Sequence, residues 1–368
     1  MKSSSQVGKP TLPENSLAAE ESSGYASHLI AVAPYGVSSA STRARVEEWL
    51  RRLEPGARRS YYLQTTDARP ATLARHPWEM LRAEVSLRSR SAFDESVVLI
   101  HREATPVSRG GVERRIMSKA GRAVYDLDDA LYAKSGTMLR TLLRPESKYS
   151  SIATQADLVI AGNDYLADWA ERHCRSVVTI PTCVEPSDYV QKTDYRVGDP
   201  PVLGWVGSFS TLLYLEALAV PLRQLHRENG TRLEVIGTGA PLPAALSPLG
   251  VSIRWSPAEV MKRLATWDVG LMPLPDTQFA QGKSAYKLLQ YCAAGLPSVA
   301  SPVGMNAGVL LKIGAPGPTN EAEWLESLRW LTTTSEDERR RLGRRARDVA
   351  TSYSYDAWSH EWQRAVLG

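Results

Sequence analysis

Two lysines and a glutamine recur at helical spacing in QGKSAYKLLQYCAAGLPSVASPVG, residues 281–304. If a helix begins near Ser284, Lys287 and Gln290 lie on one of its faces. Lys283 points the same way from one turn earlier. Like charges at this spacing slightly destabilise a helix, so a bound anion explains the pair better than helix stability does. The alternative is two solvated lysines, but the apolar segment that follows leaves little room for a solvent-exposed face.

A second anion-binding signal follows the apolar run VLGWV, residues 202–206. The run is followed by Gly207, Ser208, Phe209, Ser210 and Thr211. Glycine permits close approach of the backbone to a ligand, and the free N–H groups at the start of a helix bind phosphate. The same pattern also forms a plain turn in which serine caps the helix. The segment is therefore a candidate diphosphate site only in combination with the lysines.

Three carboxylates gather in YDLDDALY, residues 125–132, at the end of another apolar run. Asp126, Asp128 and Asp129 repel one another unless cations or donors compensate, which favours a ligand-binding role. They could orient acceptor hydroxyls, bind an amine, or cap the next helix. The Asp-x-Asp spacing also occurs in divalent metal sites. Because a three-residue motif arises often by chance, we expect no metal here.

Composition and charge exclude several classes of protein. The chain has 368 residues, 43% of them hydrophobic, and a formal net charge of +4 with both signs interleaved, so a nucleic acid partner is not expected. No apolar run approaches the roughly 20 residues of a membrane-spanning helix. The three cysteines lack metal-ligand spacing, which is typical of free thiols in a cytoplasmic protein.

Short apolar runs alternate with helical stretches from Tyr25 onward, which indicates parallel sheets with right-handed crossovers. The chain is long for a single core. We predict an α/β fold class with two tandem Rossmann-like, doubly wound domains facing a cleft. The expected parts are a disordered tail (1–24), an N-terminal domain (25–190), a linker (191–201), a C-terminal domain (202–350) and a C-terminal helix (351–368).

Residues 281–304 resemble the signature of retaining glycosyltransferases of family 4, which have the GT-B fold. That signature is Glu, seven residues, Glu, and then Gly-x-Pro before an apolar strand. Alignment on residues 294–297 places Gly282 at the first glutamate and Gln290 at the second, so both glutamates are missing. The resemblance implies that Gln290 holds the nucleotide ribose, whereas Gly282 cannot replace the contact to the donor sugar. The family's Arg/Lys pair after residue 206 is also absent, so we infer that Lys283 and Lys287 bind the diphosphate.

The same resemblance nominates further positions. The loop after VSIRW would contact the base, which points to Trp255 and Ser256, although Trp255 could equally belong to the core. The loop after the first strand would lie near donor phosphate and acceptor. The cleft candidates are therefore Ser39, Ser41, Arg43, Asp126 and Asn163. A histidine often lies near the aspartates in this family, and YDLDDALY has none. The C-terminal helix would return towards the N-terminal domain.

These observations predict a cytoplasmic, metal-independent glycosyltransferase that needs no cofactor. It would move a sugar from a nucleoside diphosphate donor, with UDP favoured, to a hydroxyl acceptor: a polysaccharide, a glycolipid or an aminocyclitol-type natural product such as an aminoglycoside. Asp128, Asp129 and Lys287 are the candidate catalytic residues, and retention is expected from the resemblance alone. The alternatives are a nucleotide-sugar-binding protein without activity and another GT-B enzyme such as an epimerase or phosphorylase. The basic stretch 102–122 could meet an anionic membrane, an acidic acceptor or solvent.

Overall fold

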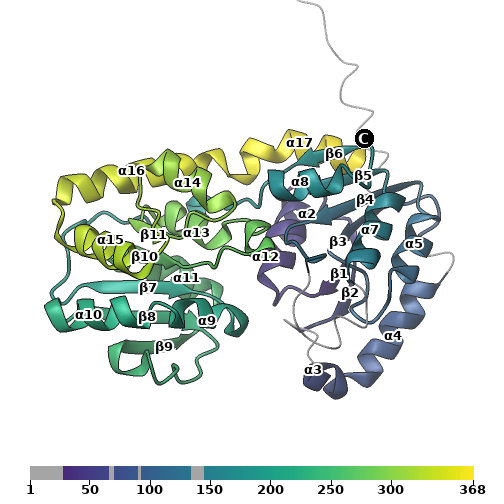
Figure 1. The fold of residues 1–368 in the computed structure, drawn as a ribbon. Coiled ribbons are helices and arrows are strands. Elements are labelled where there is room, and N and C mark those ends of the chain that lie inside the picture. Colours follow the sequence, from purple (N-terminus) through teal and green to yellow (C-terminus); the bar gives the residue numbers. More distant parts are fainter. Residues whose placement is uncertain (1–27, 66–69, 90–92, 134–144) are drawn as a thin grey trace, which may run out of the picture.

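The structure is a computed structural model that describes residues 28–65, 70–89, 93–133 and 145–368. Two α/β domains lie side by side, and the last two helices run along one side of both (Figure 1). The tail expected at residues 1–24 lies outside the described residues.

The N-terminal domain contains a parallel sheet with six strands in the described ranges, in the order β2-β1-β3-β4-β5-β6. The strands are β1 (Leu29–Tyr35), β2 (Arg58–Leu63), β3 (Val97–His101), β4 (Arg122–Leu127), β5 (Leu158–Ala161) and β6 (Val177–Thr179). Strands β1, β3, β4 and β5 are nearly continuous apolar runs because helices cover both faces of the sheet.

The helices of this domain follow the strands in alternation. They are α1 (Ala40–Thr42), a π-helical turn (Arg43–Glu47), α2 (Glu48–Leu53), α3 (Pro70–Arg75), α4 (Pro77–Arg88), α5 (Gly111–Met117), α7 (Pro145–Gln155), α8 (Asp164–Ala170) and a 3-10 turn (Pro186–Asp188). Asn163 begins α8, and its side chain accepts a hydrogen bond from the backbone N–H of Leu166.

The C-terminal domain has a second parallel sheet, and the five strands described there lie in the order β11-β10-β7-β8-β9. The strands are β7 (Val202–Val206), β8 (Arg232–Gly237), β9 (Gly250–Arg254), β10 (Val269–Met272) and β11 (Ser298–Ala300). The two parallel sheets confirm the predicted doubly wound fold class.

Helices of two kinds, α and 3-10, alternate with these strands and follow them along the chain. They are α9 (Phe209–Glu216), α10 (Ala219–Asn229), two 3-10 turns (Ser247–Leu249 and Leu264–Thr266), α11 (Pro257–Arg263), α12 (Gln278–Gln281), α13 (Tyr286–Ala294), α14 (Met305–Ile313), α15 (Glu321–Thr333), α16 (Glu336–Ser352) and α17 (Tyr355–Leu367). No helix of the described residues has the length and apolar character that crossing a membrane would require.

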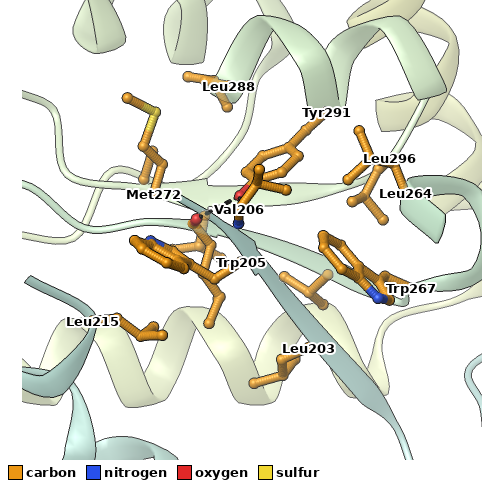
Figure 2. Close-up of a cluster of buried hydrophobic side chains, with 14 of the residues drawn as sticks. Leu203, Trp205, Val206, Leu215, Leu264, Trp267, Met272, Leu288, Tyr291 and Leu296 are labelled. Atoms are coloured by element: carbon orange, nitrogen blue, oxygen red, sulfur yellow. Dashed lines mark hydrogen bonds between the residues drawn. The ribbon is translucent and has the colours of Figure 1, made fainter. Parts of the chain in front are cut away.

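The core of the C-terminal domain fixes α13 against the central strands (Figure 2). The Tyr291 hydroxyl donates to the carbonyl of Leu271 at 3.0 Å and accepts from the N–H of Val206 at 3.1 Å. On β7, a Cβ at Gly204 would lie 1.8 Å from the Trp267 ring, so only glycine fits. Helix α13 is thereby held at a defined position relative to the end of β7, where the lysine-bearing segment meets residues 207–211.

Helix α17 packs on the N-terminal domain. Trp362 stacks on Trp49 with ring centroids 5.4 Å apart, and Tyr355 meets the same ring edge-on at 4.9 Å. The Tyr355 hydroxyl also donates to the carbonyl of Ala44 at 3.1 Å. Since α16 belongs to the C-terminal domain, α16 and α17 together connect the two domains (Figure 1).

Candidate functional site

Lys287 lies in the first turn of α13 and reaches the start of α9. Its Nζ donates to Thr211 Oγ1 at 3.2 Å and lies 4.8 Å from the centroid of the Trp205 ring. No carboxylate within the described ranges lies at ion-pair distance from it. Burial, and secondarily the neighbouring Lys283, lowers the pKa of Lys287 to about 7. A cation without an acidic partner, beside the positive end of a helix, is suited to binding an anion.

The loop between β7 and α9 supplies hydroxyl groups around this ammonium group. Ser208 begins α9, but its side chain caps no backbone N–H. Its Oγ instead lies 2.9 Å from Ser210 Oγ and 3.4 Å from Thr211 Oγ1. At Gly207 a Cβ would lie 2.2 Å from the Trp205 ring, so the close turn requires glycine. The loop thus presents hydroxyl groups and a helix N-terminus to the same space as Lys287.

Lys283 does not belong to α13. Helix α13 begins at Tyr286, two residues after Ser284, because Ala285 adopts a left-handed conformation (φ 53°). Lys283 therefore lies in the preceding loop, where its Nζ is 3.4 Å from Asp129 Oδ1 and 4.5 Å from the centroid of the Phe279 ring. The lysines do not form one stripe of a helix, but Lys283 remains near enough to lower the pKa of Lys287.

Gly282 and Gln290 are the positions aligned with the two glutamates of the family signature. Gly282 lies at the domain interface, and Gln290 is buried. The Gln290 side chain is buried, and its Nε2 donates to the Tyr189 hydroxyl at 3.0 Å. The carbonyl of Gly282 accepts from Asn163 Nδ2 at 3.1 Å. A Cβ at Gly282 would lie 2.7 Å from the backbone nitrogen of Ala130. In this arrangement of the domains, position 282 has no space for a glutamate.

Asp126 lies behind the surface of the cleft. Its carboxylate forms a buried ion pair with Arg45 and is 2.6 Å from His101 Nδ1. Burial alone would raise the pKa of Asp126, but Arg45 and His101 outweigh it and hold the pKa below its usual range. Asp126 is 2% exposed, so the structure places this predicted acceptor contact where it can support the site but not touch a substrate.

Arg102 binds the other two aspartates. Its Nε donates to Asp128 Oδ1 at 2.6 Å, and its Nη2 donates to Asp129 Oδ2 at 2.6 Å. Asp128 also accepts from the Ser41 hydroxyl. Burial opposes ionisation of Asp128, but Arg102 and His101 hold its pKa far below the usual range. Asp129 is the member of the trio that also meets Lys283, so it joins the two sides of the site.

The π-helical turn that follows α1 reaches the other domain through Arg43. Its guanidinium lies 4.4 Å from the centroid of the Trp255 ring, and its Nη1 donates to the carbonyl of Val37 at 2.9 Å. Burial lowers the pKa of Arg43. Ser39 is buried at the start of α1, and Ser256 uses its side chain to cap α11, accepting from the N–H of Glu259 at 3.1 Å. Of these candidates, Arg43 and Trp255 lie against each other across the interface.

A cavity of about 1100 Å³ lies between the domains, and its lining includes Phe279, the ring that Lys283 contacts. Its walls include Tyr132, Trp169, Tyr165, Tyr214 and Phe279. Tyr132 and Trp169 stack with centroids 4.1 Å apart, and no residue of the described ranges makes a hydrogen bond with the buried Tyr132 hydroxyl. Aromatic faces with polar groups at their edges are suited to binding sugar rings and other flat, hydroxyl-bearing ligands.

No family model and no curated protein matches this sequence. Solved structures do match. WaaG, a glycosyltransferase involved in lipopolysaccharide biosynthesis, is 16% identical over 92% of this chain and 99% of its own, with a TM-score of 0.66. HepE from Anabaena, solved with UDP and glucose, is 14% identical over 92% and 99% (TM-score 0.65). The α,α-trehalose 6-phosphate synthase from Burkholderia multivorans is 10% identical over 93% and 96% (TM-score 0.63). The chain has the GT-B fold.

Sequence reasoning missed three members of this GT-B cleft: Arg45, His101 and Arg102. The histidine that seemed to be absent near the aspartates comes from the neighbouring strand, because His101 on β3 pairs in register with Asp126 on β4. Its Nε2 is 2.7 Å from Ser41 Oγ, so the ring joins the loop after β1 to the aspartates. The signal was present in VVLIHRE, where polar residues follow a buried strand just as they do in YDLDD.

Gly282→Ala is expected to disturb the GT-B domain interface. The new Cβ would lie 2.6 Å from the Cβ of Ala130, so the domains must shift, at an expected cost of about 1–3 kcal/mol in unfolding free energy. Gly308→Ala is the matched control, because nothing lies within 4 Å of a Cβ there and α14 should gain roughly 0.5–1 kcal/mol. Chemical denaturation measures both, and equal stability of the two variants would contradict the tight contact at Gly282.

Proposed function

We propose that this GT-B protein is a glycosyltransferase that moves a sugar from a nucleoside diphosphate donor to a hydroxyl acceptor. The observation that carries the proposal is the ammonium group of Lys287, which has no carboxylate partner in the described part of the chain and lies at the start of α9. Such a cation is unfavourable in the empty protein and favourable once an anion binds. A diphosphate is the anion that a sugar donor would bring.

The expected role of Lys287 is to stabilise the diphosphate as it leaves. The bond between the anomeric carbon and the phosphate oxygen breaks, and negative charge grows on the leaving group, where Lys287, the α9 N-terminus and Lys283 can offset it. The donor base would lie near Trp255 and the ribose near Gln290. We favour UDP, and the similarity to HepE, whose structure holds UDP and glucose, supports this preference. Retention of configuration is part of the proposal.

Transfer without a metal ion fits the chemistry of the aspartates. Asp126 is paired with Arg45, and Asp128 is paired with Arg102, so guanidinium groups already occupy the positions in which a divalent cation would need carboxylate oxygens. Lys283 and Lys287 would supply the positive charge that a metal ion supplies elsewhere.

The acceptor is expected in the aromatic cavity, with its reactive hydroxyl near Asp129. This carboxylate is partly exposed and lies at the junction of Arg102 and Lys283, so it can orient a hydroxyl or an amine beside the donor. A polysaccharide, a glycolipid headgroup and an aminocyclitol all carry such groups. Closure of the domains would exclude water from the reaction.

Thermal stabilisation by UDP, GDP, dTDP and NAD, each with and without EDTA, tests the donor site. We expect one nucleoside diphosphate to raise the melting temperature regardless of EDTA, and Lys287→Ala to remove most of the shift. Lys312→Ala is the matched control, because Lys312 also lies over an aromatic ring, 5.0 Å from the Tyr353 centroid, but is exposed on α14. A shift that requires metal, or that survives in Lys287→Ala, would contradict the proposal. Donor binding without turnover on any acceptor would favour the non-catalytic alternative.

A further inference from the structure

Helix α4 exposes an apolar ridge to solvent. Trp78, Leu81 and Val85 are 74%, 54% and 65% exposed, and their spacing of three and four residues places them on one face of the helix. The opposite face carries Leu87, which is buried in the core of the N-terminal domain. Single exposed apolar residues are ordinary, but an aligned row that includes a tryptophan marks an interaction surface.

Cations flank the ridge, and the helix turns its acids away from it. On a helical wheel Arg82 lies on one side of the ridge and Arg88 on the other, and both are exposed. Glu84 accepts from Thr105 Oγ1 at 2.9 Å and from Arg88 Nε at 3.0 Å. Glu79 accepts from the N–H of Gln64 at 2.7 Å. The outward surface of α4 is therefore apolar in the middle, with the cation of Arg82 along one edge and the ion pair of Arg88 with Glu84 along the other.

A small basic hollow lies between the end of α4 and α5. It has a volume of about 150 Å³, and Arg88, Arg115 and Lys119 are among its lining residues. Arg115 and Lys119 belong to the basic stretch 102–122, and both are exposed. Three cations around a hollow of this size can bind a phosphate group. The apolar ridge thus ends at Val85, one helical turn before Arg88, which lines the hollow.

We propose that the apolar ridge of α4, together with the cations of the basic hollow, docks the protein on a membrane surface that contains anionic lipid. The apolar ridge would enter the boundary between headgroups and acyl chains, where tryptophan is favoured, while the arginines contact lipid phosphates. The helix lies on the side of the N-terminal domain away from α17 (Figure 1), so docking leaves the contact between α17 and the domain intact. This surface is separate from the donor site, and it does not depend on the proposed transfer reaction.

Co-sedimentation of the full chain with phosphatidylcholine vesicles, with and without phosphatidylglycerol, tests the proposal. We expect binding only when phosphatidylglycerol is present, and weaker binding as salt is added. Trp78→Ser with Leu81→Ser should lower the partition coefficient about tenfold or more. Arg82→Gln should lower it about fivefold. Trp330→Ser, which changes an exposed tryptophan on α15, is the matched control and should bind as the unaltered chain does.

Three results would overturn the docking surface. One is equal binding to vesicles with and without anionic lipid. The second is unchanged binding by the Trp78 and Leu81 double variant when circular dichroism shows that it is folded. The third is self-association of the unaltered chain in sedimentation velocity that the double variant abolishes, since the ridge would then contact a second copy. The melting-temperature shift with nucleotides is measured without lipid, so the test of the donor site and the test of membrane docking can fail or succeed independently of each other.

Discussion

Lys287→Met is expected to weaken binding of the donor diphosphate between about 10-fold and 100-fold, the loss typical of one charged hydrogen bond. The same variant should unfold at a higher temperature than the unaltered chain when no ligand is present. If Lys287 stabilised the fold, its removal would lower the unfolding temperature, so weaker binding together with a higher unfolding temperature identifies a binding residue. Both effects follow from one feature, an ammonium group that lies against the Trp205 ring and, among the described residues, has one hydroxyl partner, Thr211 Oγ1 at 3.2 Å.

The stability difference between Lys287→Met and the unaltered chain should depend on pH, because the pKa of Lys287 is lowered in the folded state. Its ordinary value of 10.5 falls to about 7 in the folded chain, so between these values the unfolded state binds more protons than the folded state. Stability therefore rises with pH across this window, and the full cost of the partly buried charge is present below pH 7. The stability gain of Lys287→Met should accordingly be largest at pH 6 and shrink towards pH 10. Parallel thermal melts of the two proteins check the trend.

Diphosphate binding should take up a proton at Lys287. Above pH 7 the empty site holds a mostly neutral amine, and an anion at 3 Å favours the ammonium form. Calorimetry of UDP binding at pH 8 in buffers of different ionisation enthalpy should give an uptake approaching one proton, falling towards zero at pH 6. Lys312→Ala should keep this uptake and Lys287→Met should lose it. Equal uptake in all three proteins would place the proton elsewhere.

The fold class could be read from the sequence because both sheets are covered on two faces. Their central strands are therefore short, nearly continuous apolar runs, such as VVLIH in β3 and VLGWV in β7. Strand β2, RRSYYL, gives no such signal, since it lies at the edge of its sheet and its first residues are exposed arginines. The break in the helix before Tyr286 was equally hidden, because a left-handed alanine has no sequence signature.

Some residues of the candidate site could likewise be predicted from the sequence, and others could not. The loop that begins at Gly207 could be found because it directly follows an apolar strand in the chain, and Lys287 because it lies at helical spacing from Gln290. The guanidinium partners of the aspartates could not, since Arg102 is 26 positions from Asp128 and Arg45 is 81 positions from Asp126. Only the register of β3 beside β4 and the fold of the loop after β1 bring those partners together.

Arg45→Met is expected to cost about 3–5 kcal/mol in unfolding free energy, the largest stability change at the cleft. Arg45 is 2% exposed, pairs with Asp126, and donates from Nη1 to the carbonyl of Ile180 at 2.7 Å. Methionine fills much of the same volume, so the loss is mainly electrostatic: Asp126 stays buried without its guanidinium partner, although His101 Nδ1 still lies 2.6 Å from it. Urea denaturation near neutral pH measures the change.

Three further measurements separate this charge effect from a packing defect. Arg51→Met removes an exposed ion pair with Glu48 and should cost less than about 1 kcal/mol. Adding Asp126→Asn to Arg45→Met should recover part of the stability, because the unpaired carboxylate is gone. The lowered pKa of Asp126 contributes stability above its ordinary pKa that is lost as the carboxylate protonates, so the deficit of Arg45→Met should also narrow in acid. A deficit that neither Asp126→Asn nor acid reduces would show that Arg45 acts through packing and through its bond to Ile180.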